Sequence, residues 1–142
     1  MRFFKIISVN KIPPSRNIHV TIACAIPKKS KIDDIIDKLI QLGVDRIIPL
    51  ITERVIVKLD DKKKLSRRER WEKIALSSVK QSQRNIIPVI ETVKDMGEVL
   101  RNSKDFDLKL IGALTGKRMP LKKVLDNAKA KNILVFKSFA SE

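Results

Sequence analysis

The feature that most constrains the fold is a strand–helix–strand pattern near the start of the chain. Residues 18–26 form an apolar, β-branched run, which predicts a strand buried on both faces. Residues 31–42 carry Ile and Leu at helical spacing, and Gly43 is predicted to end that helix. Residues 44–51 are a second apolar run, in which Pro49 indicates an edge strand or a strand end. A helix between two such strands predicts a parallel βαβ unit.

The alternation of helices and strands continues after a polar, basic connection at residues 52–64. Ser66 and Glu69 have the spacing of a capping box, which predicts a helix from there to about residue 82. Trp71 lies on the apolar stripe of that helix and is predicted to belong to the core. Shorter elements are then predicted as strands at 87–93, 107–114 and 132–136 and as helices at 95–102 and 120–129.

These elements predict one α/β domain built on a mostly parallel, doubly wound sheet. The chain has 142 residues, 43% of them hydrophobic, which is enough for a substantial core and excludes intrinsic disorder as the main state. Residues 3–12 are predicted as one more strand, which Pro13-Pro14 ends.

The charge balance points to nucleic acid. Lys and Arg number 31 against 16 Asp and Glu, so the net charge is +15, and phosphate neutralisation is the usual use of such a field. The alternative explanation of this charge is an ordinary solvated surface that is rich in Lys. The densest candidate patch for an RNA backbone consists of Lys58, Lys62, Lys63, Lys64, Arg67, Arg68 and Arg70. A second, smaller candidate patch consists of Lys117, Arg118, Lys122 and Lys123.

Several other functions are excluded or disfavoured by composition. The single Cys24 cannot form an internal disulfide, and with the single His19 it offers no usual metal site, so no metal is expected. None of the four glycines forms a GxGxxG or GxxxxGK[ST] loop, which disfavours Rossmann dehydrogenases and Walker-type NTPases. No apolar run is long enough to cross a bilayer and the N-terminus lacks the features of a signal peptide, so the expected compartment is the cytoplasm.

Blocks of sequence in a specific order resemble one family. The pattern K-x-x-x-I-I-x-K…L-G-V-x-x-I-x-P-L occupies Lys31 to Leu50, and T-E-R follows at residues 52–54. Trp71 to Ala75 and the Q-S-x-R-N block at 81–85 come next. The chain thereby resembles the RsmE family of SPOUT methyltransferases, which modify N3 of a uridine in small-subunit (16S) ribosomal RNA. The resemblance implies S-adenosyl-L-methionine (SAM) as cofactor and ribosomal RNA as partner.

The same blocks supply candidate site residues. Glu53 and Arg54 follow a strand end, where Arg54 could hold a phosphate or order an active site, or could form a loop ion pair with Glu53. Gln81, Arg84 and Asn85 cluster at a helix end, where they could contact RNA or simply cap the helix. No catalytic residue is assigned.

The chain also departs from the family pattern at both ends. Residues 1–14 would represent one remnant strand of an N-terminal PUA-like barrel, and residues 15–142 a partial SPOUT domain that lacks its C-terminal trefoil-knot segment. The Gly-rich cofactor loop expected after Phe136 is replaced by Lys137 to Glu142, so we expect no cofactor-binding residues and no activity from the chain alone. The family's homodimer uses the knot and is doubtful here. A non-enzymatic RNA-binding module, or a decayed remnant, is the alternative.

Overall fold

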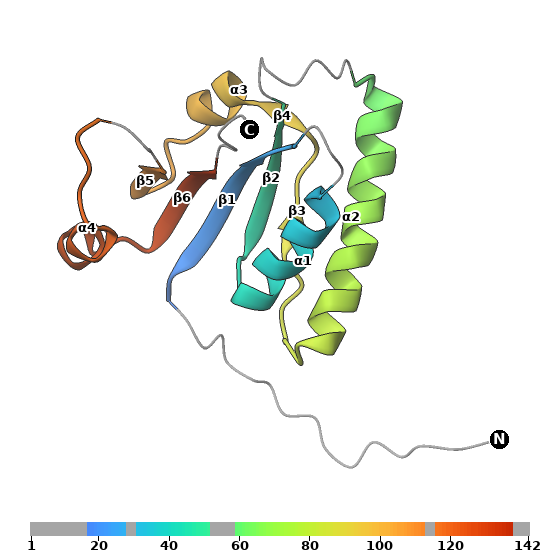
Figure 1. Ribbon diagram of the computed structural model, residues 1–142, viewed down its shortest axis with the longest axis horizontal. Coiled ribbons are helices and arrows are strands. Elements are labelled where there is room, and N and C mark those ends of the chain that lie inside the picture. Colours follow the sequence, from blue (N-terminus) through green and yellow to red (C-terminus); the bar gives the residue numbers. More distant parts are fainter. Residues whose placement is uncertain (1–16, 28–30, 52–58, 113–115, 138–142) are drawn as a thin grey trace, which may run out of the picture.

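The computed structural model describes residues 17–27, 31–51, 59–112 and 116–137. One sheet of six strands, with every pairing parallel, runs in the order β3-β2-β1-β6-β5, and β4 also pairs with β2 (Figure 1). Its strands are β1 (His19–Ala25), β2 (Arg46–Ile51), β3 (Val89–Ile90), β4 (Lys94–Asp95), β5 (Leu108–Ile111) and β6 (Asn132–Lys137). The helices are α1 (Ile32–Leu42), α2 (Asp61–Gln81), α3 (Met96–Arg101) and α4 (Leu121–Ala128).

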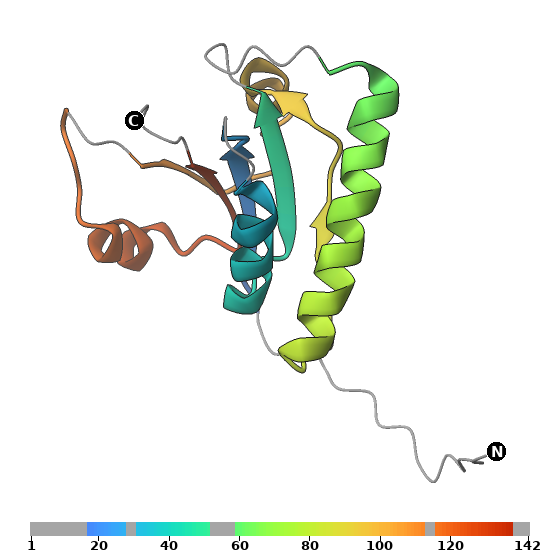
Figure 2. The same ribbon diagram turned by 45° about the vertical axis from the view of Figure 1, so that its right-hand side comes forward.

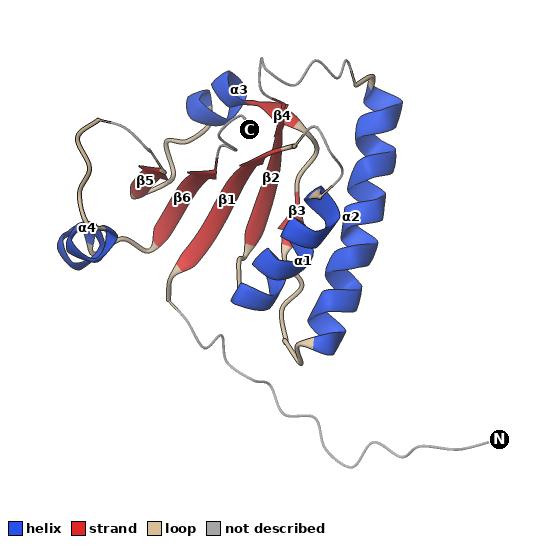
Figure 3. Ribbon diagram, in the orientation of Figure 1, coloured by secondary structure: helices blue, strands red, loops and turns tan. Residues whose placement is uncertain are grey.

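Helices cover both faces of the sheet, which confirms the predicted doubly wound α/β class. Helices α1 and α2 lie together on one face, as the rotated view in Figure 2 shows, and they build the larger core. The smaller core forms on the other face, where Val99 of α3 packs with Ile48, Leu134 and Phe136 of the strands. The secondary-structure colouring in Figure 3 shows the same arrangement.

Strand β1 contributes to both cores, as the apolar run predicts. Ile22 and Cys24 face the core under α1 and α2, whereas Ala23 faces the core under α3. Five consecutive residues of β1, from Thr21 to Ala25, are buried. Successive side chains of a strand point to opposite faces, so only a continuous apolar run can satisfy a strand that is covered on both sides.

Helix α1 forms and ends where the sequence indicates. Ile32, Ile36 and Ile40 are buried on one stripe, which repeats at the spacing of a helix. Gly43 adopts the left-handed conformation with φ at 95°. Its N–H donates to the carbonyl of Ile40 at 3.0 Å, and the N–H of Val44 donates to that of Leu39 at 3.2 Å. This pair of bonds is a Schellman motif, which a residue without Cβ accommodates most easily.

The prediction that Pro49 marks an edge or a strand end is wrong. Strand β2 is interior, and Pro49 is fully buried beside Cys24 of β1. On the side of β2 away from β1, the carbonyls of Asp45 and Ile47 accept hydrogen bonds from the N–H groups of Val89 and Glu91. Every second residue directs its backbone to that side, so the backbone of Pro49 faces it too. Neither β3 nor β4 pairs at this position, so the missing N–H of proline falls at the gap between them.

The predicted start of α2 is also wrong. The helix begins at Asp61, five residues before Ser66, and the carboxylate of Asp60 accepts a 2.8 Å bond from the N–H of Lys63. An aspartate N-cap accepts a hydrogen bond from a backbone N–H that would otherwise have no partner. The helix therefore begins directly after Asp60 and not at the predicted capping box of Ser66 and Glu69. The predicted buried face of α2 is confirmed, with Trp71 1% exposed.

The remaining predictions differ in detail. The strand predicted at 87–93 forms only at Val89–Ile90 (β3), and a second short strand, β4, follows at Lys94–Asp95. Apart from α2, the other strands and helices predicted within the described residues are present, with bounds within three residues of the predicted ones. Helix α4 buries none of its residues, and Leu121 and Leu125 are 58% and 42% exposed. The predicted strand at residues 3–12, and the barrel remnant at 1–14, lie outside the described residues.

Candidate functional site

The carboxyl ends of the parallel strands meet at one edge of the sheet. Ala25 of β1 is in register with Leu50 of β2, and Cys24 is in register with Lys137 of β6. In open α/β sheets, ligands bind in the crevice beyond the carboxyl ends of the strands. This edge is therefore where the fold itself favours a functional site.

A small apolar cavity of about 200 Å³ opens beside this edge. Drug-sized ligands usually occupy about 300–1,000 Å³ and need a few convergent polar groups. Most of the wall here is aliphatic or aromatic, and the lining offers little to hold a ribose or an amino-acid head group. The described residues alone therefore do not form a complete site for a nucleoside cofactor. The cavity is lined by Ile22, Leu39, Gly112, Val135, Phe136 and Lys137.

The dense basic patch predicted from the sequence lies on the first turns of α2, at the same end of the molecule as the carboxyl edge (Figure 1). Lys58, the first predicted member of the patch, and the separate site candidates Glu53 and Arg54 fall outside the described residues. The six described members of the patch are Lys62, Lys63, Lys64, Arg67, Arg68 and Arg70.

Most of these cations have an acidic partner. Arg68 Nε donates to Glu72 at 2.9 Å, and the Arg70 guanidinium bonds to Asp33 of α1. Lys63 lies 3.9 Å from Asp60 and Lys64 lies 3.7 Å from Asp61. Neutralisation by neighbouring carboxylates weakens the field that the patch presents to a polyanion. The structure leaves Lys62 and Arg67 as the members for which no ion pair forms among the described residues.

The second predicted group, Gln81, Arg84 and Asn85, lies at the opposite end of α2. The helix has 21 residues, so at 1.5 Å per residue about 30 Å separates its two ends. Arg84 Nη2 donates a 3.0 Å bond to the backbone carbonyl of Gln41, in the last turn of α1. The structure thus does not bring the two predicted groups together, and it gives Arg84 a helix-capping contact.

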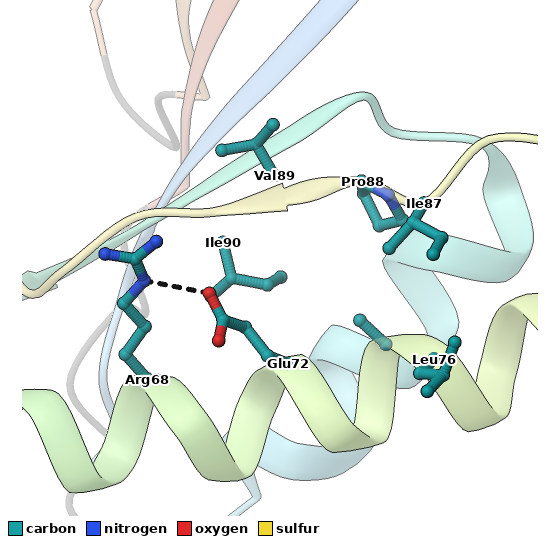
Figure 4. Close-up of a pocket in the computed structure, with 8 residues that line it drawn as sticks. Arg68, Glu72, Leu76, Ile87, Pro88, Val89 and Ile90 are labelled. Carbon is teal, nitrogen blue, oxygen red and sulfur yellow. Dashed lines mark hydrogen bonds and ion pairs between the residues drawn. The ribbon is translucent and has the colours of Figure 1, made fainter.

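A larger cavity of about 380 Å³ lies between α2 and the edge strand β3 (Figure 4). The Arg68–Glu72 ion pair stands at one side, and Leu76, Ile87 and Ile90 provide apolar walls. Its position on the outer edge of the sheet separates it from the carboxyl ends of β1 and β6. The full lining consists of Arg68, Glu72, Ala75, Leu76, Ile87, Pro88, Val89 and Ile90.

The titratable groups of the sheet serve structural roles. Burial raises the pKa of the Cys24 thiol to about 11, against a smaller opposing effect of the Lys137 charge, so this thiol stays protonated at neutral pH. Backbone N–H groups of Asn132 and Lys131 donate to Asp107 at 2.8 and 3.0 Å and lower its pKa. Among the described residues, no cluster of three His, Cys, Asp or Glu side chains could hold a metal ion, and no helix could span a membrane.

Comparison with known proteins defines the class. A family model described as an RNA methyltransferase domain matches residues 14–136, so the chain belongs to the RNA methyltransferase domain family. Within it, the chain is 43% identical over 90 residues to ribosomal RNA small subunit methyltransferase E of Bacillus subtilis (strain 168), which is 63% of this chain and 35% of that relative. The predicted resemblance to the RsmE family of SPOUT methyltransferases is thereby confirmed.

Solved structures agree with this assignment. The Neisseria gonorrhoeae ribosomal RNA small subunit methyltransferase E, bound to S-adenosyl methionine, matches with a TM-score of 0.72 at 27% identity. The match covers 84% of this chain and 48% of that one. A crystal structure described as a hypothetical protein matches with a TM-score of 0.77 at 32% identity, over 92% of this chain and 52% of that one. This chain therefore spans about a third of the curated relative and half of each solved chain.

Proposed function

We propose that this chain forms part of a SAM-dependent methyltransferase that modifies N3 of a uridine in small-subunit ribosomal RNA. The observation that carries the proposal is the match of the parallel β3-β2-β1-β6-β5 sheet to the SAM-bound Neisseria enzyme over 84% of this chain. The Bacillus relative, named as a small-subunit rRNA methyltransferase, supports the choice of substrate. We infer from this substrate that the protein acts in the cytoplasm.

The reaction needs an electrophilic methyl group, which SAM supplies, and a uracil N3 that has lost its proton. Positioning and preorganised electrostatics are the means by which a protein accelerates such a transfer. Residues of this chain contribute by binding and orienting RNA, and Glu53 and Arg54, which follow β2 in the sequence, remain the predicted candidates. We infer that residues 15–142 belong to the methyltransferase domain and that residues 1–14 belong to a barrel that precedes it.

The cofactor side can be tested directly on the 142-residue chain. Because the described residues form no complete nucleoside site, we expect isothermal titration to detect no SAM binding tighter than about millimolar. The full-length Bacillus relative, titrated in the same buffer, is the positive control. Micromolar SAM binding by this chain would overturn the inference that its own residues are insufficient.

The activity is tested by nucleoside analysis. Small-subunit RNA is incubated with SAM and one of three proteins: this chain, the Bacillus relative, or a joined protein. The joined protein is this chain fused to the part of the Bacillus relative that this chain does not match. We expect 3-methyluridine from the relative and the joined protein and none from the isolated chain. Methylation at another base or at another uridine atom by the joined protein would refute the proposed reaction.

The alternative function is RNA binding without catalysis. The net charge of +15 favours it as much as it favours the enzyme, because both require phosphate contacts. The joined protein separates the two, since a binding module would retain RNA in that experiment without producing any methylated nucleoside.

A further inference from the structure

The share of Lys and Arg side chains that form ion pairs differs between the side of the sheet near α2 and the side near β5 and α4. Residues 101–131 contain nine Lys and Arg against three Asp and no Glu. The ion pairs found among the described residues all lie between His19 and Lys94, so none involves this C-terminal part of the chain. The region of β5 and α4 therefore carries exposed cations for which no ion pair is found within the part of the chain that the structure describes.

The contrast with α2 is specific. The basic turns of α2 are interleaved with Asp61, Glu69 and Glu72 and reach Asp33 of α1, so four of the six described cations there are paired. Of the two basic patches predicted from the sequence, the longer one therefore has more of its cations in ion pairs.

The second set of cations is exposed, and hydrogen bonds join the elements beside it. Strand β5 is an edge strand at the side of the sheet away from α2 (Figure 2). The carboxylate of Asp107, just before β5, accepts the N–H groups of Lys131 and Asn132, which fastens the end of the α4–β6 connection to the start of β5. Helix α4 buries no residue, so Lys122 and Lys123 are exposed on it.

We propose that this surface binds the phosphate backbone of RNA. It consists of the exposed Lys117, Arg118, Lys122 and Lys123, which lie just before α4 and in its first turn, and is called the β5–α4 basic surface. Lys and Arg on a protein surface bind phosphates by charge, without reading sequence, and release counterions as they do so. The proposal rests on the proposed function only in choosing RNA as the polyanion, because the family acts on RNA.

The test compares two variants of equal charge change. Lys117, Arg118, Lys122 and Lys123 are replaced by Ala in one, and Lys62, Lys63, Lys64 and Arg68 in the other, so each loses four positive charges. Binding of a fluorescein-labelled small-subunit rRNA fragment is followed by anisotropy as a function of salt. We expect the first variant to lose at least tenfold in affinity and to lower the salt slope by about 0.7–0.9 for each phosphate contact removed.

The matched variant is expected to lose less than threefold, because three of its four cations, Lys63, Lys64 and Arg68, already have acidic partners. Equal losses, or a larger loss from the α2 variant, would overturn the proposal. A third variant, with Lys117, Lys122 and Lys123 replaced by Arg, must bind like the parent, since the contact depends on charge. Circular dichroism melting checks that all variants fold.

Two further readouts separate the possible causes of failure. Vesicles containing phosphatidylserine test whether the surface prefers a lipid membrane, and binding to vesicles with no binding to RNA would refute the proposal. The assay needs neither SAM nor methyl transfer. Loss of methylation in the joined protein with RNA binding intact would therefore count against the proposed function and leave this surface assigned.

Discussion

The indole Nε1 of Trp71 donates a 3.1 Å hydrogen bond to the carboxylate of Asp33, which joins the middle of α2 to the first turn of α1. The same carboxylate is bonded by Arg70, one residue earlier on α2. Trp71 is 1% exposed, so its ring belongs to the larger core while its only polar atom is satisfied at the edge of that core. This contact fixes how the two helices lie on their common face of the sheet.

Shortening Trp71 tests how much this contact stabilises the fold. We expect Trp71→Ala to lower the free energy of unfolding by about 3–5 kcal/mol, because it removes a large buried ring and leaves a cavity. Trp71→Phe should cost less, since part of the ring volume remains, although Asp33 loses one donor. Urea denaturation measures both. Lys73→Ala, on the exposed side of the same helix, is the control and should change stability by less than about 0.5 kcal/mol.

Arg84 makes a second connection between the same helices, at their other end. Because its guanidinium donates to the carbonyl of Gln41, we expect Arg84→Ala to lower the free energy of unfolding by about 0.5–1.5 kcal/mol. Asn85→Ala, an exposed neighbour, is the control for urea denaturation. Anisotropy with the rRNA fragment tests the second role predicted from the sequence. A loss of RNA affinity in Arg84→Ala that exceeds the loss in Asn85→Ala would establish that Arg84 also contacts RNA.

Periodicity allowed much of this fold to be predicted. The stripe of Ile32, Ile36 and Ile40 and the continuous apolar run of β1 are local patterns, and burial against the sheet enforces both. The start of α2 was missed because Asp60 caps a helix whose first turn carries no apolar residue of the core. The break between β3 and β4 lies opposite Pro49 of β2, so the local sequence of residues 87–95 does not indicate it.

The candidate site was harder to predict because charge neutralisation is a property of three-dimensional neighbours. Arg70 finds its partner Asp33 at a separation of 37 residues, and Arg84 reaches Gln41 at a separation of 43. A run of basic residues in the sequence therefore overstates the field at α2. The β5–α4 basic surface, by contrast, comes from one short stretch of sequence, and no ion pair of its cations is found among the described residues.

Gly43 provides a test of the turn that ends α1. Its φ of 95° lies where a side chain with Cβ is strained, so we expect Gly43→Ala to lower the free energy of unfolding by about 1–2 kcal/mol. Gly112→Ala is the matched control, because a Cβ added there meets no atom within 4 Å. Urea denaturation compares them. Equal stability of the two variants would contradict the role assigned to the left-handed turn.

Asp107 predicts a specific loss of stability in acid. Its bonds from the N–H groups of Asn132 and Lys131 lower its pKa in the folded state below the ordinary value of 3.8. Folding therefore favours the carboxylate, so its stabilisation is complete above the ordinary pKa and is lost as the pH falls through the folded value. We expect Asp107→Asn to lower the denaturation midpoint at neutral pH and to flatten its decline between about pH 5 and pH 2.

The matched control is Asp105→Asn, two residues away, where no hydrogen bond to the carboxylate is found among the described residues. It should keep the acid dependence of the parent, because the bonded carboxylate at Asp107 is still present. Urea midpoints of the parent and both variants, recorded at each pH in one buffer series, measure the effect. If Asp107→Asn retained the full acid dependence, the clamp between the start of β5 and the α4–β6 connection would contribute nothing to folding.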